Sequence, residues 1–270
     1  MFVALSVIGI LLVIAAIVLT LWWTISQAHY DNVYLKPGDE YEVGDDVYTI
    51  PAHLTIRGDK TVRKLKEQYL LDQKELLRTL TTALKENDIE YWVACGTLLG
   101  YVRHQTFLPW DDDVDLHTHW SNREYMFSKD FNTMLNHHGL ESYFIMTSSV
   151  DQAFYDGAMV RVRKKGTKVP SCDIFFVKEM DDDNNMFAKI DGWNKSAVTQ
   201  SKKERWHRDL LFPTEERTLD GLTLQFPKNP EAVVKNMYGG EKVLTEIVAR
   251  KPWASHRFLY VALPFLFHNP

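Results

Sequence analysis

Four aspartates lie within five consecutive residues of this chain, and their spacing is better suited to chemistry than that of any other segment. They are Asp111, Asp112, Asp113 and Asp115. Val114 and Leu116 alternate with the acids, and an alternation with a period of two is typical of a strand with one buried face. In such a strand, Asp113 and Asp115 share the face opposite the apolar residues.

Two carboxylates on one strand face, about 7 Å apart, repel each other when both are ionised. A divalent cation is the usual way to hold them ionised, and hard oxygen ligands at an open site favour Mg²⁺ or Mn²⁺ together with phosphate oxygens. We therefore predict a metal site at Asp113 and Asp115. A solvated acidic loop is the alternative, and the interleaved apolar residues count against it.

Gly96 and Thr97 follow a short apolar segment and begin a predicted helix. Glycine lets a backbone approach a phosphate closely, and the first amides of a helix direct N–H groups toward an anion. Arg103 lies about two turns along this helix, where its guanidinium can bind a diphosphate through two hydrogen bonds. We therefore predict a phosphate-binding turn beside the metal site. For Arg103, a surface ion pair with the acidic segment is the alternative.

Asp173 stands near the start of an otherwise apolar strand, Cys-Asp-Ile-Phe-Phe-Val-Lys. An acid in that setting is unfavourable unless it is paired or coordinates a cation. Beside the metal pair, a third carboxylate could deprotonate an attacking hydroxyl or hold a second cation. A structural hydrogen-bonding role is the alternative for Asp173.

The segment 96–115 has the pattern G-T-L-L-G-x-x-R-H-x-x-F-x-P-W-D-D-D-x-D, which closely resembles the LicD/fukutin family of phosphotransferases. Further matches extend the resemblance over roughly residues 65–240: Arg161, Arg163, Thr167, Phe226-Pro227 and Tyr238-Gly239. The resemblance implies a nucleotidyltransferase fold. It also implies transfer of a phospho-alcohol, such as phosphocholine or ribitol phosphate, from a CDP-linked donor to a glycan or glycoprotein, with release of CMP.

The resemblance assigns a role to each motif residue. Asp113 and Asp115 would hold Mg²⁺ or Mn²⁺, and Asp173 would be the third acid of the catalytic set. The residues facing the donor phosphates would be Gly96, Thr97 and Arg103, with Asp111 in a supporting position. One branch of the family carries a zinc-binding cysteine cluster, and the two cysteines of this chain, Cys95 and Cys172, do not form one. These two residues could pair or stay reduced.

Two other classes of function share some of these features. A metal-dependent glycosyltransferase also uses a D-x-D motif, but the Gly-Thr turn and the third acid favour phosphotransfer. A catalytically silent scaffold on the same fold is the other alternative, and the presence of all three acids counts against it. His117 and His119 continue the acid-bearing face of the strand, and we expect hydrogen bonding beside the site rather than metal ligation from them.

The elements that position these residues are predicted from hydrophobic periodicity and capping signals. Strands are expected at 91–95, 113–117, 158–164 and 172–178, and helices over about 62–86, 97–104, 121–139 and 229–239. Ser121 and Glu124 form a predicted capping box for the third helix. This alternation predicts an α/β (α+β) domain, which in the family resembled is a mixed sheet flanked by helices.

The first 23 residues differ from the rest of the chain, because residues 2–23 carry no charge. At about 1.5 Å per residue, a helix of this length spans a bilayer core of roughly 30 Å. We predict a transmembrane signal-anchor over 1–23, a stem over 24–60 and a catalytic domain over 61–270, with a cleaved signal peptide as the alternative. This organisation predicts a single-pass membrane protein of the Golgi or ER with a lumenal catalytic domain.

The overall composition excludes some classes of protein. The 270 residues include 31 Lys plus Arg and 36 Asp plus Glu, for a net charge of −5. A mildly acidic chain gives no reason to expect a nucleic-acid partner. Hydrophobic residues make up 45% of the sequence, which argues against a mainly disordered chain.

Overall fold

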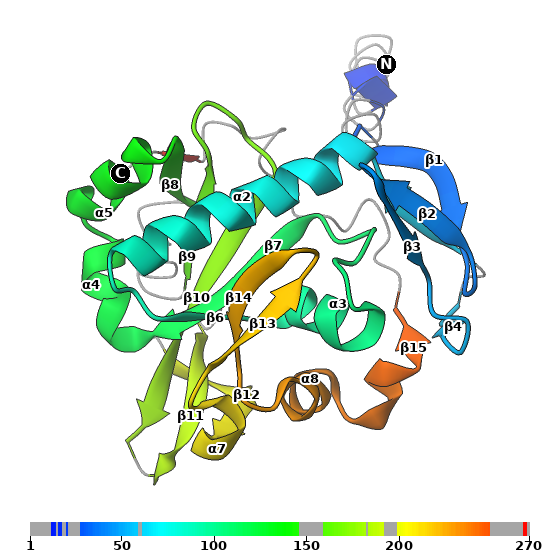
Figure 1. Cartoon of the computed structure of the whole chain (residues 1–270). Coiled ribbons are helices and arrows are strands. Elements are labelled where there is room, and N and C mark those ends of the chain that lie inside the picture. Colours follow the sequence, from blue (N-terminus) through cyan, green and yellow to red (C-terminus); the bar gives the residue numbers. More distant parts are fainter. Residues whose placement is uncertain are drawn as a thin grey trace, which may run out of the picture.

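The computed structural model describes residues 12–14, 16–17, 20, 28–58, 61–145, 159–181, 183–191, 199–248 and 267–268. In this part of the chain, strands and helices combine into a mixed α/β structure (Figure 1). The mixture of strands and helices agrees with the sequence prediction.

A central strand, β10 (Ser171–Met180), organises the largest sheet. One edge of β10 pairs in parallel with β7 (Asp113–His119). The other edge pairs first with β9 (Met159–Lys164) and then with β11 (Asp183–Asp191), both antiparallel. The outer members are β6 (Tyr91–Val93), β8 (Leu140–Ile145), β12 (Thr199–His207) and the short β16 (Phe267–His268).

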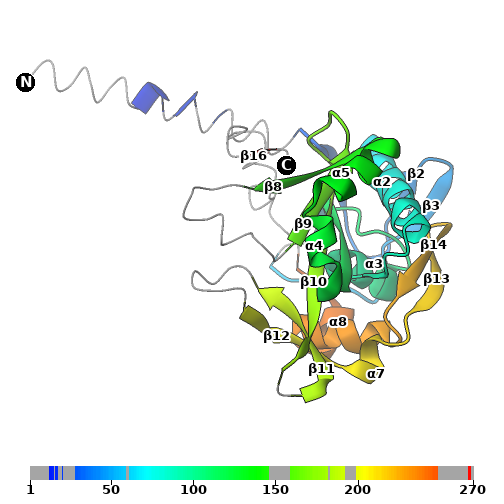
Figure 2. The ribbon, with the colours of Figure 1, turned by 90° about the vertical axis from the view of Figure 1, so that its left-hand side faces the viewer.

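The two faces of this sheet differ because side chains alternate along each strand. On β7 and β10, Val114, Leu116, Cys172 and Ile174 lie on one face and are fully buried in the hydrophobic core. Helix α2 (Glu67–Glu86) crosses the sheet and brings its leucine stripe into that core (Figures 1 and 2). The acids of β7 and β10 therefore lie on the face of the sheet opposite α2.

Helix α3 (Cys95–His104) connects β6 to the segment before β7. A Cβ on Gly100 would lie only 2.6 Å from the backbone carbonyl oxygen of Thr106, so the helix can pack this closely only because residue 100 is glycine. Helix α8 (Pro230–Tyr238) begins after Asn229, whose side chain caps it, and ends at Gly239 in the left-handed conformation. The predicted bounds of this helix are confirmed.

Smaller elements complete the structure. The predicted helix over 121–139 is divided into η1 (Trp120–Asn122), α4 (Arg123–Met126) and α5 (Lys129–His137), and Ser128 rather than Ser121 provides a side-chain cap. The predicted helix over 62–86 begins later, because residues 62–65 form β5 (Val62–Leu65). The remaining elements are α7 (Arg208–Leu211), β13 (Glu215–Leu219), β14 (Leu222–Phe226), η2 (Glu241–Leu244) and β15 (Glu246–Ile247).

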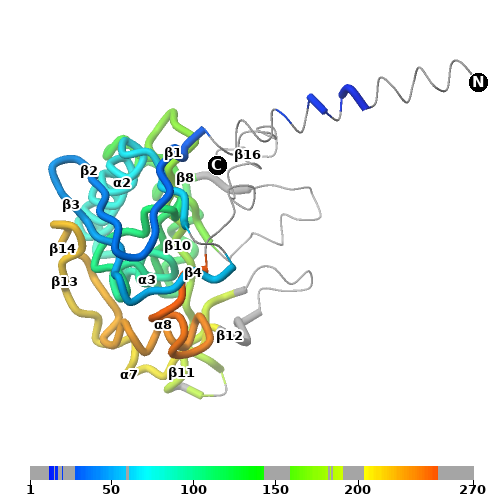
Figure 3. The backbone as a smooth tube through the Cα atoms, turned by 90° about the vertical axis from the view of Figure 1, so that its right-hand side faces the viewer, coloured from blue at the N-terminus to red at the C-terminus, as the bar shows by residue number. Residues whose placement is uncertain are grey.

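The predicted stem contributes four strands to the fold (Figure 3). They are β1 (Tyr30–Leu35), β2 (Glu40–Val43), β3 (Asp46–Thr49) and β4 (Thr55–Ile56). β1 pairs with β5, β4 pairs with β15, and Ile50 and Leu54 are buried in the main core. The described part of 24–60 is thus packed into the domain, which differs from the predicted stem.

The predicted membrane anchor is not supported. Residues 12–14, 16–17 and 20 are the only described part of the segment 1–23, so most of that prediction lies outside the described residues. Among the described residues, no helix combines the length and the apolar character needed to cross a bilayer. The longest of them, α2, has 20 residues but carries charged side chains along its length. The predictions of a transmembrane helix and of a single-pass membrane protein of the Golgi or ER are corrected accordingly.

Candidate metal and phosphate site

Three carboxylates from two strands meet at the centre of the site. In the parallel register of β7 and β10, Asp115 lies directly opposite Asp173, while Asp113 lies two residues earlier on the same face of β7. One carboxylate oxygen from each of the three lies within 4.8 Å of the others. Asp115 and Asp173 are only 7% and 3% exposed, and Asp113 is half-buried. The two predicted metal ligands and the predicted third acid thus form one cluster.

Asp115 is fixed by the first turn of α3. The backbone N–H of Gly96 donates a 2.9 Å hydrogen bond to Oδ2 of Asp115. In return, the backbone N–H of Asp115 donates a 2.9 Å bond to Oγ1 of Thr97. Burial and the neighbouring carboxylates, led by Asp113, raise the pKa of Asp115 well above its usual range. A bound cation would offset this repulsion and stabilise the ionised form.

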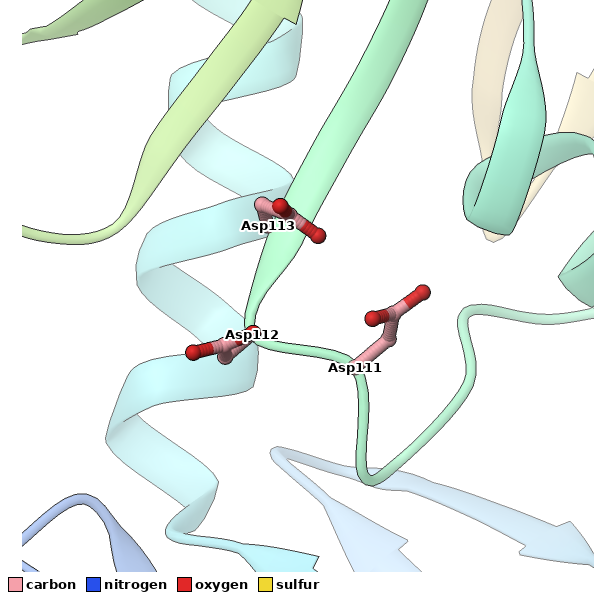
Figure 4. Close-up of side chains that lie close together, drawn as sticks. All are labelled: Asp111, Asp112 and Asp113. Carbon is pink, nitrogen blue, oxygen red and sulfur yellow. The ribbon is translucent and has the colours of Figure 1, made fainter. Parts of the chain in front are cut away.

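Asp111 and Asp112 extend the acidic group, and one oxygen each from Asp111, Asp112 and Asp113 also lies within 4.8 Å of the others. Figure 4 shows Asp112 on the side of the chain that faces α2, whereas Asp111 and Asp113 extend to the other side. A Cβ built on Gly96 would lie 2.0 Å from Oδ2 of Asp111. The carboxylate of Asp111 therefore lies against the Gly-Thr turn, and its supporting role toward the donor phosphates stays a prediction.

The backbone that carries the acids is held by α2. The hydroxyl of Tyr69 donates a 2.7 Å hydrogen bond to the carbonyl oxygen of Asp112. Nε2 of Gln73 lies 3.0 Å from the carbonyl oxygen of Asp111 and 3.3 Å from that of Asp113. These contacts to the backbone of residues 111–113 were not predicted. A glutamine among the leucines of α2 indicated them, because a buried polar side chain needs hydrogen-bond partners.

Arg161 holds the third acid. Its Nε and Nη2 donate to the two carboxylate oxygens of Asp173, and the two residues are paired across β9 and β10. Both side chains are 5% exposed, so the ion pair is buried. Arg161 is one of the residues that carry the family resemblance, but the resemblance does not predict its contact with Asp173. An arginine in an apolar strand, close to an unexplained buried acid, was the signal for it.

A cavity of about 280 Å³ opens beside the acids. Its lining includes Gly96 and Asp111 from the acid-bearing segments, the aromatic Trp110 and Tyr238, and the charged residues Arg57, Arg103, Lys242 and Glu246. Its cationic and aromatic lining, next to a carboxylate cluster, suits an anionic ligand with a planar group.

Arg103 lines this cavity but has a further contact that the sequence did not predict. Its Nη1 donates to the carbonyl oxygens of Val243 and Glu246, at 3.1 Å and 2.7 Å. Burial lowers the pKa of Arg103 to about 10, so the guanidinium stays charged at neutral pH. Arg103 is therefore an anchor for the segment 241–247, and the predicted contact with donor phosphates stays a prediction.

The two histidines that continue the strand face are engaged elsewhere. Burial, with a contribution from Lys189, lowers the pKa of His117 well below its usual range, and its Nε2 lies 4.0 Å from Sγ of Cys95. Nε2 of His119 lies 3.1 Å from a carboxylate oxygen of Glu90. Neither histidine belongs to the acidic groups found among the described residues. Cys95 and Cys172 are both free thiols.

The donor set fits a divalent cation such as Mg²⁺ or Mn²⁺. It consists of carboxylate oxygens alone, the ligand type that these hard cations prefer. Burial, and then repulsion from Asp113, Asp111 and Asp173, raises the pKa of Asp115, and both effects would be offset by a bound cation. Asp113, Asp115 and Asp173 are the residues that would hold the ion.

Short segments of the chain are similar to characterised and uncharacterised proteins. Over 74 residues it is 32% identical to lipopolysaccharide cholinephosphotransferase LicD of Haemophilus influenzae, covering 27% of this chain and 26% of the relative. Over 67 residues it is 34% identical to ribitol 5-phosphate transferase FKRP of Homo sapiens, covering 23% of this chain and 14% of the relative. Over 53 residues it is 42% identical to the uncharacterized protein RT0683 of Rickettsia typhi, covering 20% and 17%. These matches span about a quarter or less of each relative.

Among solved structures, the lincomycin-bound lincosamide antibiotic adenylyltransferase LnuA aligns with a TM-score of 0.36 and 10% sequence identity, covering 57% of this chain and 79% of that chain. A likeness this low does not bear on the function. The sequence profile described as LicD/FKTN/FKRP, nucleotidyltransferase domain, matches residues 88–229. This match covers more than half of the 270 residues and includes all three acids and the Gly-Thr turn. The chain therefore belongs to the LicD/FKTN/FKRP nucleotidyltransferase-domain family.

Proposed function

We propose that this protein transfers a phospho-alcohol from a CDP-linked donor to a hydroxyl group of a glycan and releases CMP. The observation that carries the proposal is the meeting of Asp113, Asp115 and Asp173 beside the first turn of α3. Family membership supports a transferase of phosphorus-containing groups. The names of two relatives, a cholinephosphotransferase and a ribitol 5-phosphate transferase, suggest the class of alcohol.

The three carboxylates would hold Mg²⁺ or Mn²⁺, which when bound neutralises diphosphate charge and stabilises the charge that develops on the departing oxygen. The chain's own residues position the reactants. Gly96 lets the carboxylates of Asp111 and Asp115 lie directly against the first turn of α3, because a Cβ there would be 2.0 Å from Oδ2 of Asp111 and 3.4 Å from Oδ2 of Asp115. The cavity lined by Arg103 and Tyr238 would hold the nucleotide part of the donor.

The transfer is a displacement at phosphorus. The acceptor hydroxyl oxygen forms a bond to the phosphorus that carries the alcohol, and the bond from that phosphorus to the bridging oxygen breaks. The electron pair of this bond leaves with CMP. Arg161 binds both oxygens of Asp173, which favours a role for Asp173 in holding charge and orienting the hydroxyl over removal of its proton. The proton of the acceptor hydroxyl would pass to solvent.

A donor screen tests the proposal. The purified protein is incubated with Mg²⁺ and CDP-choline, CDP-ribitol or CDP-glycerol in the presence of a glycan acceptor, and with UDP-sugars in parallel. We expect acceptor-dependent release of CMP with at least one CDP-alcohol, and its loss in Asp113→Asn. Release of UDP instead would indicate a glycosyltransferase. An absence of metal-dependent CDP binding by calorimetry would indicate a non-catalytic scaffold.

A further inference from the structure

Lys189 lies on the acid-bearing face of the central sheet, although it is distant in sequence from every motif of the site. On β10, Asp173, Phe175 and Val177 share one face because they are separated by two residues each. Lys189 of β11 is the cross-strand partner of Val177, so its side chain belongs to that same face. Asp115 lies opposite Asp173 on the other edge of β10.

The side chain of Lys189 extends toward the acids. Its Cα is opposite Val177, but its Nζ lies 4.7 Å from the centre of the Phe175 ring. Phe175 is two residues nearer to Asp173 than Val177 is, about 7 Å along the strand. The ammonium group is thus displaced along the sheet in the direction of Asp115 and Asp173.

Glu204 holds the ammonium in this position. A carboxylate oxygen of Glu204, on the neighbouring strand β12, lies 2.5 Å from Nζ of Lys189, and the two side chains are 19% and 17% exposed. A lysine that is mostly buried is unfavourable unless it has an ionic partner, and Glu204 provides one.

An ammonium group has three N–H donors, and the ion pair with Glu204 leaves donors that can point toward the reaction centre. Arg161 is already bound to both oxygens of Asp173. The 280 Å³ cavity is lined by Gly96 and Asp111, whereas Lys189 lies on β11 beside the C-terminal half of β10 and does not line that cavity. A diphosphate that extends from the cavity past the acids and along the face of β10 would bring its second phosphate toward Lys189.

We propose that Lys189, positioned by Glu204, binds the phosphate group of the substrate on the side of the acid cluster away from the cavity. This proposal rests on the proposed function, in which that phosphate carries the transferred alcohol. Lys189 is then a catalytic residue that contacts the group being transferred, and Glu204 is a positioning residue. A solely structural ion pair between β11 and β12 is the competing explanation.

Binding of inorganic pyrophosphate in the presence of Mg²⁺, measured by calorimetry, separates the two explanations without requiring turnover. We expect Lys189→Met to weaken pyrophosphate binding about 10- to 100-fold, the range of a hydrogen bond to a charged group. Mn²⁺ binding, followed by electron paramagnetic resonance, should change less than threefold. Lys189→Arg should retain part of the affinity, and Glu204→Gln should lose about 3- to 10-fold because the lysine remains but is less well held.

Lys178→Met serves as the matched control, because Lys178 is an exposed lysine on β10 that pairs with Asp181. It should leave pyrophosphate binding unchanged. If Lys189→Met does not fold, the double variant Lys189→Met/Glu204→Met removes both charges together and is measured in its place.

Pyrophosphate affinity within twofold of the unaltered protein in the lysine variants would overturn the proposal, as would a parallel loss of Mn²⁺ binding. An unaltered protein that does not bind pyrophosphate at all would also overturn it. Lysine-dependent pyrophosphate binding without CMP release from any CDP-alcohol would uphold the role of Lys189 and refute the proposed function. CMP release from a CDP-alcohol that is unaffected by Lys189→Met would refute the role of Lys189 and uphold the proposed function.

Discussion

The carboxylate of Asp111 occupies the space that a side chain on residue 96 would take, since a Cβ on Gly96 would lie 2.0 Å from Oδ2 of Asp111. One turn later in the same helix, a Cβ on Gly100 would lie 2.6 Å from the backbone oxygen of Thr106. The first obstacle is the end of a side chain that can rotate, whereas the second is backbone that cannot move without distorting the loop. The two glycines of α3 therefore have separable roles.

We predict that Gly96→Ala lowers activity and leaves stability nearly unchanged, because Asp111 can rotate away from the new methyl group but then leaves the site. Turnover should fall about 10- to 100-fold, the effect of displacing a positioned group, while the free energy of unfolding changes by less than about 1 kcal/mol. Gly100→Ala should instead destabilise the fold by about 1–3 kcal/mol. Urea denaturation and CMP release measure both effects, and equal behaviour of the two variants would contradict this assignment.

The buried pair of Arg161 and Asp173 predicts strong coupling. Arg161→Met leaves a buried carboxylate without its partner and should lower the free energy of unfolding by about 3–5 kcal/mol. Asp173→Asn should also destabilise the protein, and the double variant should lose less than the sum of the two single variants. A double-mutant cycle by urea denaturation measures this coupling. Strict additivity would mean that the contact has no energetic role.

Asp115→Asn should abolish metal binding and turnover without unfolding the protein. The substitution removes one of several repelling carboxylates from a buried cluster, so the melting temperature should stay the same or rise. Calorimetric titration with Mn²⁺ and thermal unfolding test the two parts separately. Asp45→Asn, at an exposed position, is the control. Normal Mn²⁺ affinity in the Asp115 variant would refute the metal site.

Arg103 predicts a structural effect at a distance in sequence. Arg103→Met removes the hydrogen bonds to Val243 and Glu246, so amide hydrogen exchange in the segment 241–247 should become about tenfold faster. Arg57→Met breaks only a more exposed ion pair with Glu246 and should have little effect on exchange. Mass spectrometry resolves this segment. Unchanged exchange in the Arg103 variant would show that other contacts hold it.

His104 predicts an acid-dependent loss of stability. Burial, with the charge of Arg103 next, lowers its pKa to about 3, whereas an unfolded histidine titrates near 6.5. Between these values the unfolded chain binds a proton that the folded chain does not. The free energy of unfolding therefore falls as the pH decreases, by up to about 1.4 kcal/mol per pH unit.

His104→Gln removes this term, so its stability should fall by about 2 kcal/mol less than that of the unaltered protein between pH 7.5 and 5. Urea denaturation at the two pH values measures the difference. His137→Gln, at an exposed histidine, should follow the unaltered protein. An identical pH dependence in the His104 variant would contradict a depressed pKa.

The part of the site that could be predicted lies in one continuous segment. Gly96, Thr97, Asp111, Asp113 and Asp115 fall within 20 residues of sequence, where strand alternation and a strand-to-helix turn are readable from residue types. Asp173 was predicted as an isolated acid, but its position opposite Asp115 depends on the register of two strands far apart in the chain. A parallel pairing of that kind has no local signal, because no single turn fixes it.

Other features were hidden because they depend on backbone atoms or on distant partners. Nothing in the residue type of Arg103 distinguishes a bond to carbonyl oxygens from a bond to phosphate. The residue type of Lys189 gives no indication of its position. Only its pairing with Val177 of β10 shows that it lies on the acid-bearing face. Residues 24–60 contain few apolar residues in a regular alternation, so the sequence did not reveal the strands that Ile50 and Leu54 help to anchor in the core.

Helix α3 joins two parts of the site, the acid cluster and the cavity wall formed by the segment 241–247. Its first turn holds Asp115 through Gly96, and its last turn holds the segment 241–247 through Arg103, about 10 Å farther along the axis. Between them, Gly100 lets the middle of the helix lie in close contact with the backbone of residue 106. One short helix thus sets both the position of the amide at residue 96 and that of the cavity wall at residues 241–247. The distance between the carboxylates and this wall is therefore fixed by the length of α3.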